Sequence, residues 1–214
     1  MSVTAELPDS DLVARMASGD REAFAALFRR HQATVYRFSR QMLGSTEAAE
    51  DVTQDVFVAL AQNAHRFDRA RGSLSTYLYG VARHMILRRH KRSHARVEVD
   101  IDSVEHSAAL TTEADPADEL TRTQMIQQLR VAILRLPVHY REVIVLCELH
   151  GVSYEDAARI AGCPIGTIRS RLSRARQVLT ERCSTRWNLD RADAGGPRAS
   201  ESKRKWLIPT KIDC

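Results

Sequence analysis

Two short helices joined by a tight turn are predicted by residues 153–182, SYEDAARIAGCPIGTIRSRLSRARQVLTER. Ser153 followed by Asp156 is typical of a helix N-terminus. The serine hydroxyl accepts a hydrogen bond from an otherwise unpaired backbone N–H, and the carboxylate stabilises the positive end of the helix. We therefore expect the first helix to begin at Tyr154.

The turn between the two helices is indicated by a glycine and a proline. Gly162 provides the backbone freedom that ends the first helix at Ala161, and Pro164 suits the first turn of the next helix, where a missing N–H has no partner to lose. Apolar residues then recur at spacings of three and four, which predicts a buried face formed by Ile165, Ile168, Leu172, Ala175 and Leu179. The polar residues Arg169, Ser170, Ser173, Arg174 and Gln177 are left facing outward.

The second helix of this pair is strongly basic. Between Gly166 and Arg182 the sequence has five arginines and one acid, a local balance of +4. Neighbouring like charges on a helix repel each other, so an anion stabilises the array. Arginine binds phosphate and also the guanine edge in the major groove, and serine can donate or accept a hydrogen bond there. A basic face that merely meets solvent is the alternative, but the cap, glycine, proline and arginines in this order favour a DNA-binding helix-turn-helix.

Composition limits the class of protein. The 214 residues are 43% hydrophobic, enough for one domain or two small ones, and the net charge of +5 suits a polyanionic partner. The sequence has no run of about eighteen apolar residues, and its first residues, MSVTAELPDSD, are too polar for a signal peptide. We therefore expect a soluble, cytoplasmic protein with no membrane span. Helical periodicities and the few alternating β-branched stretches predict an all-α fold.

Two segments break the helical pattern. Residues 93–119 contain eight acids and one base, a balance of −7, and have no apolar face that could offset the entropy lost on ordering. Residues 184–214 are polar, basic and rich in turn residues. The prediction is two small helical domains, at residues 1–92 and 118–183, with a flexible acidic linker at 93–117 and a flexible basic tail at 184–214.

The first half of the N-terminal domain is expected to be core. Residues 9–43 carry apolar side chains at helical spacing, with a turn at Gly19 and Asp20. A second break is predicted at Gly44 and Ser45.

The segment TEAAEDVTQDVFVALAQNA (residues 46–64) predicts an amphipathic helix. Its inward residues are Val52, Val56, Phe57 and Leu60, and its outward residues are Asp51, Gln54, Asp55 and Val58. Asp51 and Asp55 stand four residues apart, so their charges repel each other and a cationic partner would stabilise them. From these residues alone, a solvated acidic face remains the better interpretation.

A further helix is predicted by GSLSTYLYGVARHMILRRHKR (residues 72–92). At about 100° per residue, Leu74, Leu78, Val81 and Met85 form the expected buried stripe. Beside it stands a column of one aromatic and three basic side chains, namely Tyr77, His84, Arg88 and Lys91. Unpaired bases need both charge and a flat ring to stack on, and this column provides both. A basic helix end that merely meets solvent is the alternative.

Four cysteines occur without any C-x-x-C spacing, at positions 147, 163, 183 and 214. Isolated thiols in a reducing compartment are usually reduced and inert, and Cys147 lies in an apolar stretch typical of core. A metal or thiol sensor that uses His150 is the alternative, although the spacing matches no common zinc pattern. We predict no metal site and no cofactor.

Three segments in the same order resemble a bacterial RNA polymerase sigma factor of the extracytoplasmic-function (ECF) type. AEDVTQDVFVAL (residues 49–60) is similar to the family's polymerase-clamp helix, and FDRARGSLSTYLYGVARHMILRRHKR (67–92) is similar to its minus-10 segment. LPVHYREVIVLCELHGVSYEDAARIAGCPIGTIRSRLSRARQVL (136–179) is similar to its minus-35 segment.

The resemblance implies roles for particular residues. Asp51, Gln54 and Asp55 would bind the basic coiled-coil clamp of the polymerase largest subunit. The loop at residues 66–73 would hold a promoter base extruded from the stack. The residues implied to bind the melted minus-10 strand are Arg66, Tyr77, Arg83, His84, Arg88 and Lys91, and those implied to bind minus-35 DNA are Thr167, Arg169, Ser170, Arg171, Ser173, Arg174 and Arg176. Among the latter, Arg171 and Arg176 would contact phosphates.

The implied function is promoter-specific transcription initiation with core RNA polymerase, without enzymatic activity of the chain itself. The implied partners are the polymerase, duplex minus-35 DNA, single-stranded minus-10 DNA and an anti-sigma factor. A stand-alone helix-turn-helix transcriptional regulator is the alternative, and the acidic face and the aromatic-basic column speak against it.

Overall fold

The computed structural model describes the backbone of residues 7–94 and 116–193 and the side chains of residues 7–91 and 123–182. All regular elements in these ranges are helical, which confirms the all-α prediction. Contacts group the chain into two compact units. The first comprises Met1–Glu105 with Ser153–Ile165, and the second comprises His106–Val152 with Gly166–Cys214. The boundaries of 1–92 and 118–183 stay predictions.

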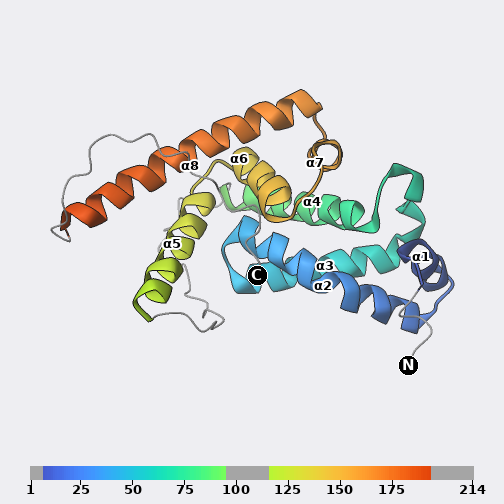
Figure 1. Cartoon of the computed structure of the whole chain (residues 1–214). Helices are drawn as coiled ribbons and strands as arrows, with labels where there is room; N and C mark the ends of the chain where they lie inside the picture. Colours follow the sequence, from blue (N-terminus) through green and yellow to red (C-terminus); the bar gives the residue numbers. More distant parts are fainter. Residues whose placement is uncertain (1–6, 95–115, 194–214) are drawn as a thin grey trace. The chain divides into compact units, whose positions relative to one another are not determined.

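Four helices build the body of the first unit (Figure 1). They are α1 (Asp9–Ala17), α2 (Arg21–Leu43), α3 (Thr46–Gln62) and α4 (Leu74–His94). Helix α2 packs against α1, α3 and α4, and α3 also packs against α4. The breaks between α1 and α2 and between α2 and α3 fall at the predicted residues, because Asp20 and Ser45 cap the following helices through their side-chain oxygens.

Asp20 forms the stronger of these two caps. Its Oδ1 accepts hydrogen bonds from the backbone N–H of Glu22 at 2.9 Å and of Ala23 at 3.1 Å, and its Oδ2 forms an ion pair with Arg15 at 2.7 Å. These donors, the Ala23 backbone first, lower the pKa of the Asp20 carboxyl. The carboxylate therefore links the last turn of α1 to the start of α2.

Aromatic rings fill the centre of the first unit. Phe38 and Phe57 are almost completely buried. The Phe28 ring stands edge-on to Phe57 with centroids 4.8 Å apart, and Phe38 contacts Tyr79 at 5.1 Å. Burial raises the pKa of Tyr79 to about 12, so its phenol stays neutral in the core.

The buried face of α4 differs from the predicted stripe. Leu74 and Leu78 are buried as predicted, but Val81 and Met85 are only half-buried. The fully buried residues further along are Ala82 and Ile86. Leu78, Ala82 and Ile86 follow an i, i+4 spacing, so the inward stripe lies one residue further round the helix than predicted.

Three short elements complete the first unit. These are the 3₁₀ turns η2 (Ala64–Arg66) and η3 (Arg69–Arg71), and helix α7 (Tyr154–Ala161). Helix α7 has the predicted bounds: the Ser153 hydroxyl accepts from the Asp156 N–H at 3.0 Å, and Gly162 ends the helix in the left-handed conformation with φ +64°. Ala157 and Ile160 of α7 are buried, and the helix packs against α4.

The second unit contains α5 (Pro116–Leu134), α6 (Val138–Val143), the π-helix η4 (Ile144–Leu149) and α8 (Ile165–Asp193). Its buried side chains include Leu136, Leu146, Ile168 and Leu172. Arg141 is also buried, and its Nη2 donates to the backbone oxygens of Leu134 and Leu136 in the turn between α5 and α6. Burial lowers the pKa of the Arg141 guanidinium, and these two carbonyls compensate part of its desolvation.

The structure differs from the prediction at the end of the chain. Helix α8 continues to Asp193, so the backbone of residues 184–193, which was predicted to belong to a flexible tail, is helical. Most of the predicted acidic linker, and the tail beyond Asp193, lie outside the described residues.

Two glycines near the start of α8 provide a matched test of backbone strain. We expect Gly162→Ala to lower the free energy of unfolding by about 1 kcal/mol, because a Cβ strains the left-handed conformation even though nothing lies within 4 Å of it. Gly166→Ala should raise the free energy of unfolding by about 0.5 kcal/mol, because this glycine is helical and has equally open surroundings. Urea titrations followed by circular dichroism measure both, and a shift in the same direction for the two variants would contradict the prediction.

Candidate nucleic-acid interface

Helix α8 has the two faces that the sequence predicts, except that Ile165 at its start is only half-buried. Ile168, Leu172 and Ala175 are at most 2% exposed, and Leu179 is 6% exposed. The outward side chains are exposed at Arg169, Ser170, Ser173, Arg174 and Gln177. Because apolar burial fixes the rotation of the helix, the polar residues form one continuous surface.

The predicted DNA-binding residues occupy different parts of this surface. Thr167 and Arg171 are half-buried, whereas Arg176 is exposed. The Ser170 hydroxyl donates to the Thr167 backbone oxygen at 3.0 Å and can still accept from a ligand. The structure pairs Arg176 with the Glu148 carboxylate of η4, a contact that the sequence did not predict.

The aromatic residue of the α4 column is held in place by a second ring. Tyr77 is half-buried, and its ring stands edge-on to Phe67 with centroids 5.9 Å apart. Burial raises the pKa of the Tyr77 phenol, and the nearby Arg66 charge lowers it by less. The ring is therefore neutral at physiological pH, which suits contact with an anionic strand. His84, Arg88 and Lys91 are exposed on the same helix, and Arg83 is half-buried.

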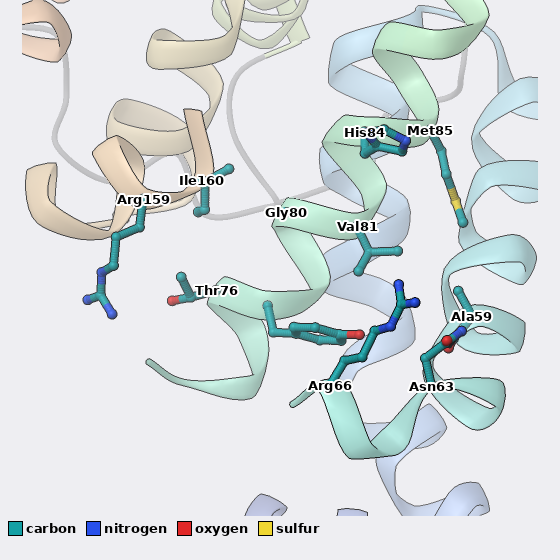
Figure 2. A pocket seen from close by; sticks show the side chains of 11 residues that line it. Ala59, Asn63, Arg66, Thr76, Gly80, Val81, His84, Met85, Arg159 and Ile160 are labelled. Atoms are coloured by element: carbon teal, nitrogen blue, oxygen red, sulfur yellow. Dashed lines mark hydrogen bonds between the residues drawn. The ribbon is translucent and has the colours of Figure 1, made fainter. Parts of the chain in front are cut away.

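A pocket of about 480 Å³ opens beside this column (Figure 2). Three of the predicted minus-10 residues, Arg66, Tyr77 and His84, line it together, whereas Arg83, Arg88 and Lys91 are not part of its lining. The other lining residues are Ala59, Asn63, Thr76, Gly80, Val81, Met85, Arg159 and Ile160. The volume lies in the range of small-molecule sites.

Sequence reasoning missed two features of this pocket. Val81 and Met85 were predicted to be core, but they line the pocket and are only half-buried. Asn63 was not singled out. Its amide donates to the Ala59 backbone oxygen at 3.1 Å, and an asparagine near the end of the predicted helical segment was the available signal.

Helix α7 forms one wall of the same pocket within the first unit. Thr76 Oγ1 donates to Asp156 Oδ1 at 3.2 Å, and Asp156 forms an ion pair with Arg159 at 2.6 Å. Arg159 also donates to the Arg71 backbone oxygen. A Cβ at Gly72 would lie 2.8 Å from the Arg159 guanidinium, so the missing side chain lets this contact form.

The outward face of α3 is acidic, as predicted. Asp51, Gln54 and Asp55 are all exposed, and Val58 beside them is 52% exposed. Asp51 has a partner that the sequence did not predict: Arg89 of α4 donates to its Oδ2 at 2.8 Å and to the Ala48 backbone oxygen at 3.0 Å. The repulsion expected between the two aspartates is thus partly relieved within the chain.

The Cys147 thiol is unsuited to redox chemistry at neutral pH, and the described thiols form no cluster. Cys147 and Cys163 are reduced and half-buried. Burial, followed by the Glu148 charge, raises the pKa of Cys147 to about 11, so its thiol stays protonated. Among the side chains that the structure describes, no three His, Cys, Asp or Glu residues come together as metal ligands. The side chains of Cys183 and Cys214 lie outside the described residues.

Within the described helices, none combines the length and the apolar character that crossing a bilayer requires.

Two family models match this chain. Sigma-70 region 2 matches residues 27–97, and Sigma-70 region 4 matches residues 126–179. The first covers the acidic face of α3 and the aromatic-basic column of α4, and the second covers α7 and the outward face of α8.

Curated proteins are similar to this chain along most of their length. The ECF RNA polymerase sigma factor SigM of Mycobacterium tuberculosis is 32% identical over 174 residues, which is 81% of this chain and 84% of that protein. SigC of the same species is 35% identical over 83% of this chain and 94% of its own length. The ECF sigma-E factor of Escherichia coli is 30% identical over 81% of this chain and 93% of its own length.

Two solved structures are also similar to this chain. The sigma factor RpoE in complex with the anti-sigma factor NepR from Bartonella quintana has a TM-score of 0.61 and 28% identity, covering 75% of this chain and 96% of that one. CnrH in complex with the cytosolic domain of CnrY has a TM-score of 0.58 and 26% identity, covering 81% and 95% respectively.

The Tyr77 ring provides a test of the α4 surface. Removing a stacking ring costs about 1–3 kcal/mol per base, so we expect Tyr77→Ala to weaken binding of single-stranded DNA by roughly tenfold or more. Tyr77→Phe should bind like the unmodified chain, because it keeps the ring and loses only the hydroxyl. Fluorescence anisotropy with a labelled single-stranded oligonucleotide, repeated at several salt concentrations, measures both. Equal losses for Ala and Phe would show that the ring is not a stacking surface.

Proposed function

Because the chain belongs to the family of ECF-type RNA polymerase sigma factors, we propose that it binds core RNA polymerase and directs it to specific promoters. The observation that carries this proposal is the order of its two regions. A region with an acidic outward face and an aromatic-basic column is followed by a helix-turn-helix with an arginine-rich outward face. A polymerase-dependent factor needs both regions, whereas a protein that only binds duplex DNA needs the second alone.

The minus-35 contact is proposed for the outward face of α8. Arg169, Ser170, Ser173 and Arg174 would contact base edges, since arginine and serine match the hydrogen-bonding groups of the major groove. Thr167 would lie near the bases at the start of the helix, and Arg171 and Arg176 would contact phosphates. The exposure of the central residues supports this assignment.

The minus-10 contact is proposed for α4 and the turn before it. Tyr77 would stack on an unpaired base, and Arg66, Arg83, His84, Arg88 and Lys91 would bind the strand around it. The pocket beside Tyr77 supports this assignment, because a base that has left the stack needs a cavity next to a ring and a cation. Arg66, His84 and Arg159 are the basic side chains in its lining.

The polymerase contact is proposed for the acidic face of α3. Asp51, Gln54 and Asp55 would meet a basic surface of the polymerase, and the exposed Val58 would add apolar contact. The segment at 93–117, with its excess of acids, would follow the path of nucleic acid through the polymerase.

Further parts of the proposal follow from these contacts. The chain would act by binding alone and would catalyse no reaction. It would work in the cytoplasm, where the polymerase is. An anti-sigma factor is proposed as a regulatory partner, and the two solved relatives support this, since one is bound to NepR and the other to the cytosolic domain of CnrY.

Transcription of genomic DNA tests the proposed function directly. Core RNA polymerase from the host organism is incubated with that organism's DNA, with and without the full chain, and the 5′ ends of the transcripts are sequenced. The proposal expects a new set of starts that share two upstream elements. A stand-alone regulator would instead bind duplex DNA without polymerase and create no new starts, and that result would refute the proposal.

Charge reversal on α3 tests the polymerase contact. We expect Asp55→Arg to weaken binding to core polymerase by on the order of tenfold or more, because it places a cation against a basic surface. Asp11→Arg on α1 is the matched control, since it makes the same charge change at an exposed position away from this face. Both are measured by fluorescence titration of the labelled chain with core polymerase. Equal affinity of the two variants would exclude α3 as the contact.

A further inference from the structure

Arg176, at one edge of the outward face of α8, is held by a carboxylate. At about 100° per residue, Arg176 and Arg171 lie on opposite flanks of the buried stripe of Ile168, Leu172 and Ala175. Ser170, Ser173 and Arg174 lie between the two flanks. Arg176 therefore lies at one edge of this surface, where the phosphates that border the major groove would lie. Its side chain is 46% exposed.

The partner of Arg176 is Glu148, which lies far away in the sequence. Its Oε1 accepts from Arg176 Nη2, and its side chain is only 22% exposed. Glu148 belongs to the π-helix η4, where the His150 N–H bonds to the Val145 oxygen five residues back at 3.0 Å. Such wider turns displace the following side chains relative to an α-helix and are frequent at functional sites. The preceding residues Ile144, Val145 and Leu146 are buried and anchor the segment.

A carboxylate in this place has an electrostatic consequence. An anion beside a surface that binds DNA repels every phosphate that approaches it, so general affinity for DNA is lowered. The guanidinium has five N–H donors, so its bond to Glu148 leaves other donors for one phosphate oxygen. Holding the arginine in one geometry also removes part of the entropy that a free side chain loses on binding.

We propose that Glu148 is a specificity-determining residue for minus-35 recognition, which orients Arg176 toward a single phosphate position and disfavours all other registers of the duplex. The inference rests on the proposed function of α8. In the matching register, Arg176 lies between Glu148 and the phosphate and neutralises both. In a shifted register a phosphate meets Glu148 without that cation between them, and binding is weaker.

Selection from a promoter pool tests this proposal. The full chain is assembled with core polymerase, and the holoenzyme is offered templates in which only the minus-35 element is randomised. The readout is the ratio of enrichment between the preferred element and shuffled elements. We expect Glu148→Ala to lower this ratio on the order of threefold to tenfold, mainly through tighter binding of shuffled elements. Glu148→Gln should give an intermediate ratio, because it keeps a hydrogen-bond acceptor and loses the charge.

Two controls separate specificity from a structural role. Asp11→Ala removes an exposed acid from α1, which belongs to the other unit, and should leave the ratio unchanged. In an Arg176→Ala background, Glu148→Ala should have little further effect, because the group it orients is gone. With shuffled duplex, the dependence of log affinity on log salt should become steeper by about one for Glu148→Ala, since a released arginine adds one phosphate contact.

The outcomes distinguish this inference from the proposed function. If the unmodified holoenzyme shows no preference among minus-35 elements, the proposed function of α8 fails and the inference fails with it. If the preference exists and Glu148→Ala and Glu148→Gln leave both the ratio and the salt slope unchanged, only the role of Glu148 is refuted. Melting curves of each variant check whether the fold is retained.

Discussion

Apolar burial fixes the rotation of each helix about its own axis, and this rotation decides which charges face outward. In α8 the buried residues Leu172 and Ile168 each contribute roughly 2 kcal/mol, whereas repulsion between neighbouring arginines costs only a few tenths of a kcal/mol per pair. Burial therefore outweighs repulsion, and the arginines stay on one surface although they repel each other. The same reasoning applies to α3, where the buried Val56 and Phe57 keep Asp55 in solvent.

Each charged surface also contains a residue of the opposite sign from another helix. Arg89 approaches the acidic face of α3, and Glu148 approaches the basic face of α8. Both pairs are partly exposed, and such pairs contribute at most about 1 kcal/mol to stability. They are weak enough for a macromolecular partner to rearrange.

Local sequence signals predicted much of the fold and which charged side chains face outward. The helix start after the turn at Asp20, the cap at Ser153 and the stop at Gly162 have short-range causes, and the structure has them at the predicted residues. The stripes of α3 and, apart from the half-buried Ile165, of α8 were also predicted correctly, because each helix packs with a single apolar face. The second half of the α4 stripe was wrong, since this helix has apolar residues on more than one side and neighbouring elements selected Ala82 and Ile86 over Val81 and Met85.

The features that sequence reasoning did not predict involve residues far apart in the chain. Arg89 and Asp51 are separated by 38 positions, and Arg176 and Glu148 by 28. The periodicity of a single helix carries no information on such pairs. The pocket has the same origin, because it combines the end of α3, the turn η2 and the half-buried side of α4.

The burial of Cys147 has a practical consequence for work with dyes. With a pKa of about 11, only about one Cys147 thiol in ten thousand is ionised at neutral pH, and maleimides react with the ionised form. Cys147 can therefore stay in place when a fluorophore is attached to an introduced surface cysteine, and the packing around η4 need not be disturbed for labelling.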